Sequence, residues 1–168
     1  MSAGLLPPYA YIPGKTPRHT EGFFDAIRAT AQPDMGQAAL LRSRAFTAGL
    51  AYLQAGYNWE AHEVLEPVWL ALPAGSAARG FVQGVIQLAN ARLKLEMGRP
   101  RAAVRLCAIT RGHWQGDAVQ GLGGDLPLAW LHQLLADAEN RAAAEMQNMQ
   151  NNATNTDARA DIPRKPAN

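Results

Sequence analysis

The sequence predicts an all-α fold, a compact antiparallel bundle of about five helices with an extended N-terminal arm and a disordered C-terminal tail. First, apolar residues recur at intervals of three and four, as in Ala38, Leu41 and Ala45. Second, Gly, Pro and capping residues separate these periodic segments. Third, we find no alternation of apolar and polar residues bounded by turn residues, so we expect no strand.

Residues 1–19 are expected to form a proline-rich arm, because their prolines and glycines disfavour a helix. Apolar residues of the arm, such as Leu5, Tyr9 and Ile12, should cover part of the core. The arm is therefore expected to be extended and to lie along the surface of the domain.

Two helices should follow the arm. Thr20 can cap a short helix over 20–31. Asp34, with Gln37 at capping-box spacing, should begin a longer helix that Gly56 ends.

The middle of the chain predicts three more helices. Asn58 is the expected cap of a helix that ends before Pro73, and Ser76 is the expected cap of the next. Pro100 lies in the first turn of a shorter helix that reaches about Arg111.

The C-terminal part begins with a glycine-rich loop over 112–124, after which Asp125 should cap a final helix. Residues 20–146 are expected to form one helical domain. Residues 147–168 are rich in Gln and Asn and have little to bury, so we expect a disordered tail.

Composition excludes several classes of protein. No stretch is apolar enough for a transmembrane helix, and no secretory signal is recognised, so we expect a cytoplasmic protein without membrane contact. The single cysteine, Cys107, excludes an internal disulfide and most structural zinc sites, and we interpret it as a core residue. The net charge of +2 does not by itself indicate nucleic acid.

The segment from Asn58 to Trp69 carries the chemically suggestive residues. At 100° per residue, His62, Glu66 and Trp69 lie together on one flank of the core face. Glu63 lies about a quarter turn further, and Glu60 is predicted to point into solvent. If the protein is an enzyme, which the sequence leaves open, the catalytic candidates are His62, Glu63 and Glu66, because imidazole and carboxylate groups carry protons. A purely structural hydrogen-bonded pair is the competing interpretation.

The His-Glu-x-x-Glu string also resembles part of the zinc helix His-Glu-x-x-His. His62 and Glu66 could supply two ligands to a divalent metal ion. A third ligand would have to come from one of the other histidines, none of which has a diagnostic spacing: His19, His113 and His132. The sequence therefore holds a fragment of a metal site, and no cofactor is firmly indicated.

The following helix carries a polar stripe between apolar positions. Gln83, Gln87, Asn90 and Lys94 recur at intervals of three and four. Buried amides need partners, so we expect Gln83 and Gln87 to face His62 and Glu66 across the helical hairpin, unless the stripe faces solvent. Trp59, Trp69, Gln83 and Gln87 are accordingly the candidate ligand-binding residues.

Pro67 interrupts the hydrogen bonding of this motif. Because proline has no N–H, the carbonyl of Glu63 loses its helical partner. The freed carbonyl could face a ligand, although a simple bend of the helix is the favoured interpretation.

The string AGYNWEAHEVLEPVW followed by GFVQGVIQLANARLKLEMGRPRAAVRL resembles the bacterial family called domain of unknown function 309. The resemblance covers about residues 46–111, and YIPGKTPRH is similar to the arm of one branch of that family. It implies a small all-α fold and no established activity. By match to the motif, it points to Trp59, His62, Glu63, Glu66, Trp69 and Gln87, whereas Pro67 departs from the usual pattern.

Charge is unevenly distributed between the two helices of the hairpin, the first being acidic and the next basic. The segment 92–111 could meet nucleic acid through Arg99, Arg101 and Arg105. It lacks the aromatic residues and the recognised fold of most nucleic-acid readers, so nucleic acid is not the favoured partner.

Three functions remain as hypotheses. The first is a pocket protein that binds a small molecule or a metal ion through the His/Glu cleft. The second is a protein-interaction module in which the His/Glu cluster is structural, with self-association into a homo-oligomer left open. The third is a nucleic-acid accessory protein that uses the basic segment.

Overall fold

The computed structural model describes residues 6–115, 119, 122 and 126–160, and the regular structure in these ranges is entirely helical. The predicted all-α fold is therefore confirmed. The helices are α1 (Asp25–Arg28), α2 (Gln37–Leu40), α3 (Arg44–Ala55), α4 (Asn58–Ala71), α5 (Ala77–Glu96), α6 (Pro100–Trp114) and α8 (Leu128–Ala160).

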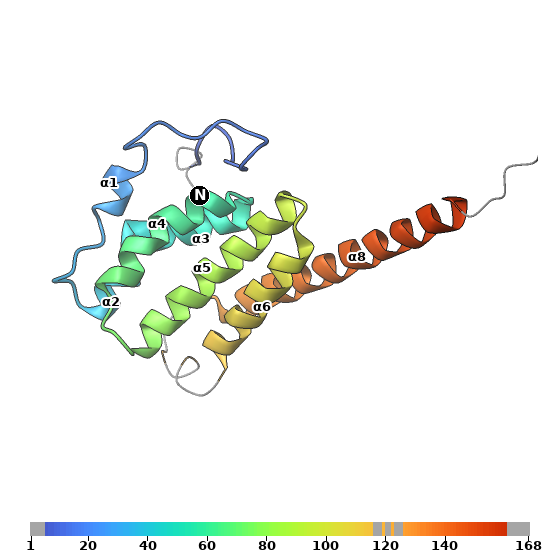
Figure 1. Ribbon diagram of the computed structural model, residues 1–168. Coiled ribbons are helices and arrows are strands. Elements are labelled where there is room, and N and C mark those ends of the chain that lie inside the picture. Colours follow the sequence, from blue (N-terminus) through green and yellow to red (C-terminus); the bar gives the residue numbers. More distant parts are fainter. Residues whose placement is uncertain (1–5, 116–118, 120–121, 123–125, 161–168) are drawn as a thin grey trace, which may run out of the picture.

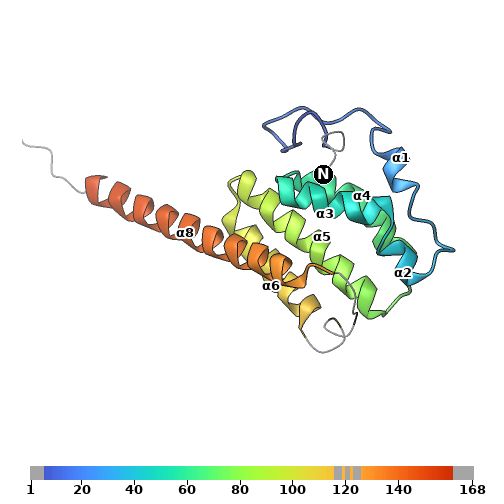
Figure 2. The same cartoon turned by 180° about the vertical axis from the view of Figure 1, so that it is seen from behind.

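Helix α5 is the central element of the bundle. It packs against α4 on one side and against α6 and α8 on the other, and α3 packs on α4 (Figure 1). Seen from behind, α8 runs along α6 and then projects beyond the body of the bundle (Figure 2). The buried residues of α5 include Phe81, Val85 and Leu88, so the core lies around this helix.

Several predicted helix boundaries are confirmed. Ser76 caps α5, because its hydroxyl accepts a hydrogen bond from the backbone N–H of Arg79 at 3.2 Å. Gly56 ends α3 with a φ of +85°, in the left-handed region that glycine adopts without strain. Pro100 is the first residue of α6.

The two helices expected before Gly56 are shorter than predicted. Within 20–31, only the four residues of α1 are helical. The helix expected from Asp34 is split into α2 and α3, and Asp34 caps neither of them. Ser43 explains the break, because its hydroxyl accepts from the N–H of Phe46 at 3.2 Å and donates to the carbonyl of Leu40 at 2.7 Å.

Two further boundaries were predicted wrongly. Asn58 is the first residue of α4 and not its cap, and its buried Oδ1 has no partner among the described residues. Residues 112–114 continue α6 and do not begin a loop. Trp114 holds this last turn, because its buried indole Nε1 donates to the carbonyl of Phe81 at 3.1 Å.

Helix α8 differs from the sequence prediction at its C-terminal end. It extends to Ala160, although disorder was expected from residue 147. Alanine, glutamine and arginine favour a helix even without burial, so a helix that packs on α6 can continue past the last core residue. The predicted cap Asp125 and the tail residues 161–168 lie outside the described residues.

The N-terminal arm was predicted to lie along the surface of the domain, and in the structure it lies over α4. Residues 6–19 contain no helix, and the backbone N–H of Tyr11 donates to the carboxylate of Glu60 at 2.6 Å. Lys15 reaches the end of α5, where its ammonium group donates to the carbonyl of Glu96. Among the described residues, no helix combines the length and apolarity that a membrane span needs.

The contact between α5 and Trp114 predicts that alanine substitution will have opposite effects on stability at two glycines of α5. A Cβ at Gly84 would lie 2.2 Å from Nε1 of Trp114, whereas a Cβ at Gly80 would meet nothing within 4 Å. We expect Gly84→Ala to lower the free energy of unfolding by about 2 kcal/mol through overpacking. Gly80→Ala should raise it by up to about 1 kcal/mol through helix propensity. Urea unfolding of both variants tests this, and equal effects would contradict it.

Candidate functional site

Glu60 is a buried carboxylate of α4, which corrects the prediction that it points into solvent. Its relative exposure is 0%, and Oε1 lies 2.7 Å from Nε2 of His19 as well as 2.6 Å from the N–H of Tyr11. Oε2 is buried and has no partner among the described residues. The arm covers this side of α4. The spacing of apolar residues along α4 cannot show which other segment of the chain packs on it.

His19 anchors the arm within a group of aromatic rings. It stacks on Tyr9 with ring centroids 4.7 Å apart and on Phe23 at 5.1 Å. The edge of Phe24 approaches it at 5.2 Å, and Trp59 lies 6.0 Å away. The arm and the residues that follow it therefore contribute an imidazole and several aromatic rings to the surface of α4.

Arg28 of α1 joins the arm region to the second half of the motif. Its Nη1 donates to the Glu63 carboxylate at 3.0 Å and to the Glu63 carbonyl at 3.2 Å. Its Nη2 lies 3.5 Å from the carboxylate of Glu66. The Glu63 carbonyl is the one that Pro67 deprives of a helical partner, so Arg28 supplies the missing donor.

The predicted cleft between α4 and α5 is present as a shallow cavity of about 160 Å³. Gln83 and Gln87 share this cavity with His62 and Glu66, which is the juxtaposition expected from the polar stripe. The full lining is His62, Glu66, Trp69, Gln83, Ile86, Gln87 and Asn90.

His62 has a defined orientation in this cleft. Its Nδ1 lies 2.9 Å from Oδ1 of Asn90. Because an amide oxygen only accepts, Nδ1 is the donor, and Nε2 is left as the acceptor of the neutral ring. The cleft therefore contains an imidazole acceptor held in place by a neighbouring helix.

Trp69 lines the cleft and also carries a buried polar group. Its indole Nε1 is buried and has no hydrogen-bond partner among the described residues. The guanidinium of Arg79 lies over its ring, 4.5 Å from the centroid, and also donates to the carbonyl of Leu72 at 2.8 Å. The ring is thus fixed by a cation while its N–H lacks an acceptor.

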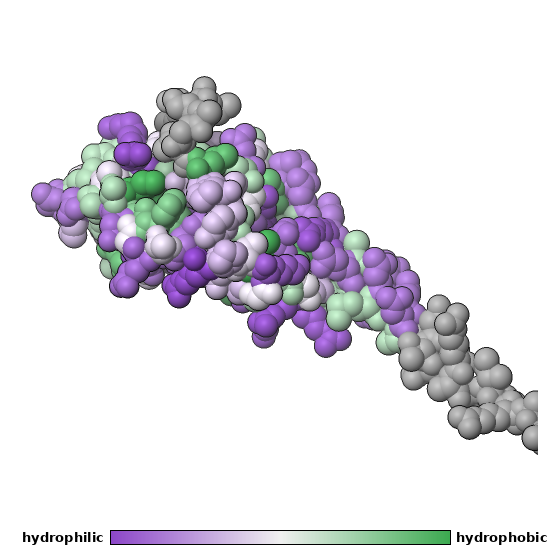
Figure 3. All heavy atoms as spheres, turned by 90° about the horizontal axis from the view of Figure 1, so that it is seen from above, coloured by the Kyte–Doolittle hydropathy of each residue, from purple (hydrophilic) through white to green (hydrophobic). Residues whose placement is uncertain are grey.

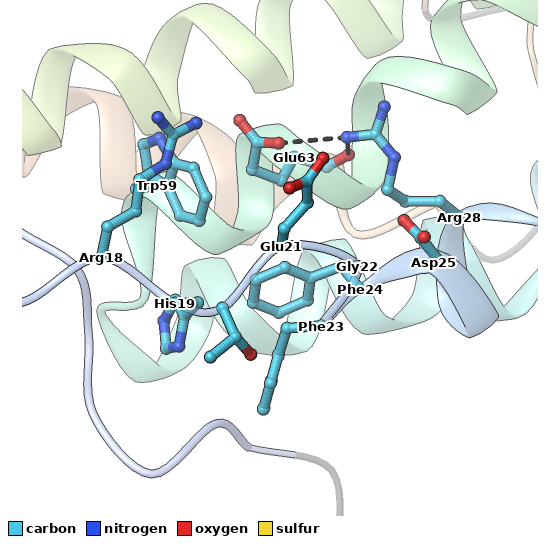
Figure 4. Close-up of a pocket in the computed structure, with 11 residues that line it drawn as sticks. Arg18, His19, Glu21, Gly22, Phe23, Phe24, Asp25, Arg28, Trp59 and Glu63 are labelled. Atoms are coloured by element: carbon cyan, nitrogen blue, oxygen red, sulfur yellow. Dashed lines mark hydrogen bonds and ion pairs between the residues drawn. The ribbon is translucent and has the colours of Figure 1, made fainter.

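A second and larger cavity lies between α4 and the segment Arg18–Arg28, which joins the end of the arm to α1, and we call it the arm cavity (Figure 4). Its volume is about 440 Å³, and it receives Trp59 and Glu63 from the motif. The remaining lining comes from the segment Arg18–Arg28: Arg18, His19, Thr20, Glu21, Gly22, Phe23, Phe24, Asp25 and Arg28. Glu63 therefore faces this cavity, whereas His62 and Glu66 line the cleft, so the three catalytic candidates do not converge on one cavity.

The described residues contain no group of three His, Cys, Asp or Glu side chains placed to hold a metal ion. His19 is engaged with Glu60, and the ring of His132 packs against Trp114 at 5.4 Å. His62 and Glu66 line one cavity without a third ligand from the candidates named by the sequence.

The basic segment is only partly available for a partner. Arg92 donates to the carbonyl of Leu53 at 2.7 Å, and Arg111 pairs with Glu139. By contrast, Arg99, Arg101 and Arg105 are exposed at the start and along the outer face of α6.

Burial raises the pKa of two acidic groups near the core. It raises the pKa of the Cys107 thiol to about 11, so the thiol is protonated at neutral pH and a poor nucleophile. Burial also raises the pKa of Tyr52, with Arg44 opposing the rise and Glu60 adding to it.

Sequence reasoning missed Arg28 and the role of His19 with Glu60. One signal for Arg28 was available, because Pro67 leaves an unpaired carbonyl at Glu63 that needs a donor from elsewhere. No comparable signal linked His19 to Glu60, since these residues meet only through the path of the arm. Asn90 was recognised as part of the polar stripe but not as the partner of His62.

Comparison with known proteins gives a family match for one segment of the chain. Residues 46–106 match the sequence profile of a family described as Domain of unknown function (DUF309). The resemblance noted from the motif is therefore confirmed over this segment. No curated protein and no solved structure matches the chain.

The Arg28 contacts predict an energetic coupling to Pro67. We expect Arg28→Ala to lower the free energy of unfolding by about 1–2 kcal/mol, because the Glu63 carbonyl and carboxylate lose their donor. In a Pro67→Ala background the loss should be smaller by about 0.5–1 kcal/mol, since the N–H restored at position 67 can bond that carbonyl.

A double-mutant cycle by urea unfolding measures this coupling. The exposed Arg42 supplies the control, because Arg42→Ala should cost the same in both backgrounds. Additive effects of Arg28→Ala and Pro67→Ala would show that Arg28 does not replace the missing helical N–H.

Proposed function

We propose that this chain, whose residues 46–106 carry a DUF309 domain, binds a small uncharged molecule in the cleft between α4 and α5. The observation that carries the proposal is the convergence of His62, Gln83 and Gln87 on one open cavity that the ring of Trp69 also lines. Amide groups on the wall of an open cavity can donate hydrogen bonds to a ligand and accept them from it.

The composition of the cleft favours a molecule that both donates and accepts hydrogen bonds. The amides of Gln83, Gln87 and Asn90 offer donors and acceptors, and Nε2 of His62 adds an acceptor. Glu66 shares Arg28 with Glu63, so its carboxylate, 3.5 Å from the guanidinium, is only partly balanced. A neutral ligand can use all three amides of the cleft, whereas an anion would be repelled by Glu66.

The size of the cleft limits the ligand. A volume of about 160 Å³ corresponds to roughly five water molecules at ~30 Å³ each. Ile86 provides an apolar contact in this space. These dimensions favour a compact polar molecule of a few non-hydrogen atoms, to which His62 could also act as a proton acceptor.

A second candidate function is binding of an acidic protein partner on α6. Val104 and Ile109 are 42% and 46% exposed on this helix, and Arg101 and Arg105 flank them. Positions 101, 104, 105 and 109 share one helical face. Exposed aliphatic side chains between arginines favour an amphipathic acidic helix over nucleic acid, whose readers typically add aromatic residues.

Binding in the cleft is tested by titrating the protein with acetamide, acetate and methylammonium while the indole N–H resonance of Trp69 is followed by NMR. We expect acetamide to shift this resonance saturably, because the bound molecule lies against the ring of Trp69. Gln87→Leu should weaken acetamide binding by at least about fivefold, because the ligand loses about one hydrogen bond. Gln54→Leu, on the exposed face of α3, is the matched control and should have no effect.

Two results would contradict this function. One is the absence of any shift with acetamide, and the other is a shift that survives Gln87→Leu unchanged. A zinc titration of the same sample tests the metal hypothesis separately, because a metal held by His62 and Glu66 should be lost in His62→Ala.

Binding at α6 is tested with a synthetic helical peptide that carries leucines on one face and glutamates elsewhere. We expect Arg101→Glu with Arg105→Glu to weaken binding at least about tenfold through charge repulsion. The exposed pair Arg42→Glu and Arg44→Glu is the control of equal charge change. Tighter, strongly salt-dependent binding to a DNA duplex would instead support the nucleic-acid alternative.

A further inference from the structure

We propose that the arm cavity is a second binding site, separate from the cleft, and that it takes an organic cation, a guanidinium or ammonium group on a short apolar body. The cation would lie against the rings of Trp59 and Phe23, with the carboxylates of Glu21 and Asp25 beside it. This inference goes beyond the function proposed for the cleft and does not depend on it.

The arm cavity has the dimensions of a ligand site. Its volume of about 440 Å³ lies within the roughly 300–1,000 Å³ of typical small-molecule pockets. Trp59, Phe23 and Phe24 provide its aromatic surfaces. Phe23, one of the lining residues, is 47% exposed although its ring stacks on His19, so part of this ring is left uncovered.

A cation already occupies one aromatic face of this cavity. The guanidinium of Arg18 lies over the ring of Trp59, 5.4 Å from its centroid, and Figure 4 shows it beside that ring. Arg18 is exposed, and such a contact is weak at exposed sites. Arg18 therefore indicates what this face attracts, and a ligand cation can displace it.

The charges around the cavity favour a cation over an anion. Arg28 and Glu63 neutralise each other through the contact at 3.0 Å, drawn as a dashed line in Figure 4. Glu21 and Asp25 remain, and no ion pair joins either carboxylate to a described residue. With Arg18 as the other charge, the balance on this wall is negative.

A buried carboxylate lies behind this wall. Oε1 of Glu60 lies 2.7 Å from His19, which lines the cavity, while Oε2 is buried without a partner among the described residues. Seen from the arm side, the surface also mixes hydrophobic and hydrophilic residues closely (Figure 3). This combination of apolar and acidic groups is the usual recognition chemistry for organic cations.

The test uses three probes of similar shape, butylguanidinium, butylammonium and butyrate, and follows the indole N–H resonance of Trp59 by NMR. We expect saturable binding of the two cations and none of butyrate. Arg18→Ala should tighten binding of butylguanidinium about two- to fivefold, because it removes the internal competitor. Glu21→Gln with Asp25→Asn should weaken it at least about fivefold.

The controls separate a local effect from a change in net charge or in folding. Asp34→Asn removes an exposed carboxylate outside the cavity and should leave the affinity unchanged. Glu21 and Asp25 are exposed, so their variants should unfold at the same urea concentration as the parent.

Three outcomes would overturn the proposal: equal or tighter binding of butyrate, weaker cation binding in Arg18→Ala, or no saturable cation binding. Failure of this proposal can be told apart from failure of the function proposed for the cleft, because binding at the two sites is followed through different tryptophans, Trp59 and Trp69.

Discussion

The buried carboxylate of Glu60 is the constraint on which the rest of the site depends. An ion removed from water costs several kcal/mol unless the protein supplies partners for it. Helix α4 has none of its own for this group, so the N–H of Tyr11 and the ring of His19 fill the role. The arm must therefore cross α4 at Glu60, and this crossing places Arg18 and Phe23 where they bound the arm cavity.

Helical geometry explains why one short motif serves two chemically different cavities. At 3.6 residues per turn, Trp59 and Glu63 share one ridge of α4, and His62 and Trp69 share another about 90° away. The first ridge faces the arm and the second faces α5. Glu66 falls between the ridges, so its carboxylate lines the cleft while it contacts Arg28 of α1.

Helical periodicity predicted the elements and the cleft, and it failed where contacts are distant in sequence. The stripe of Gln83, Gln87 and Asn90 had to pair across a short hairpin, so its position beside His62 followed from local spacing. The burial of Glu60 did not follow, because a helix pattern identifies an uncovered flank but not the segment that covers it. The break at Ser43 also escaped prediction, since a serine hydroxyl can either remain in solvent or cap a helix.

Pro67 links the arm to the cleft and also keeps the two sites separable. By leaving the Glu63 carbonyl without a helical donor, it creates an acceptor that Arg28 fills, and two contacts of 3.0 and 3.2 Å then hold Arg28 to Glu63. The contact of Arg28 with Glu66 is longer, at 3.5 Å, and is the weakest of the three. A ligand in the cleft can therefore draw the Glu66 carboxylate toward itself without releasing Arg28. The arm then stays in place, and the arm cavity keeps its shape.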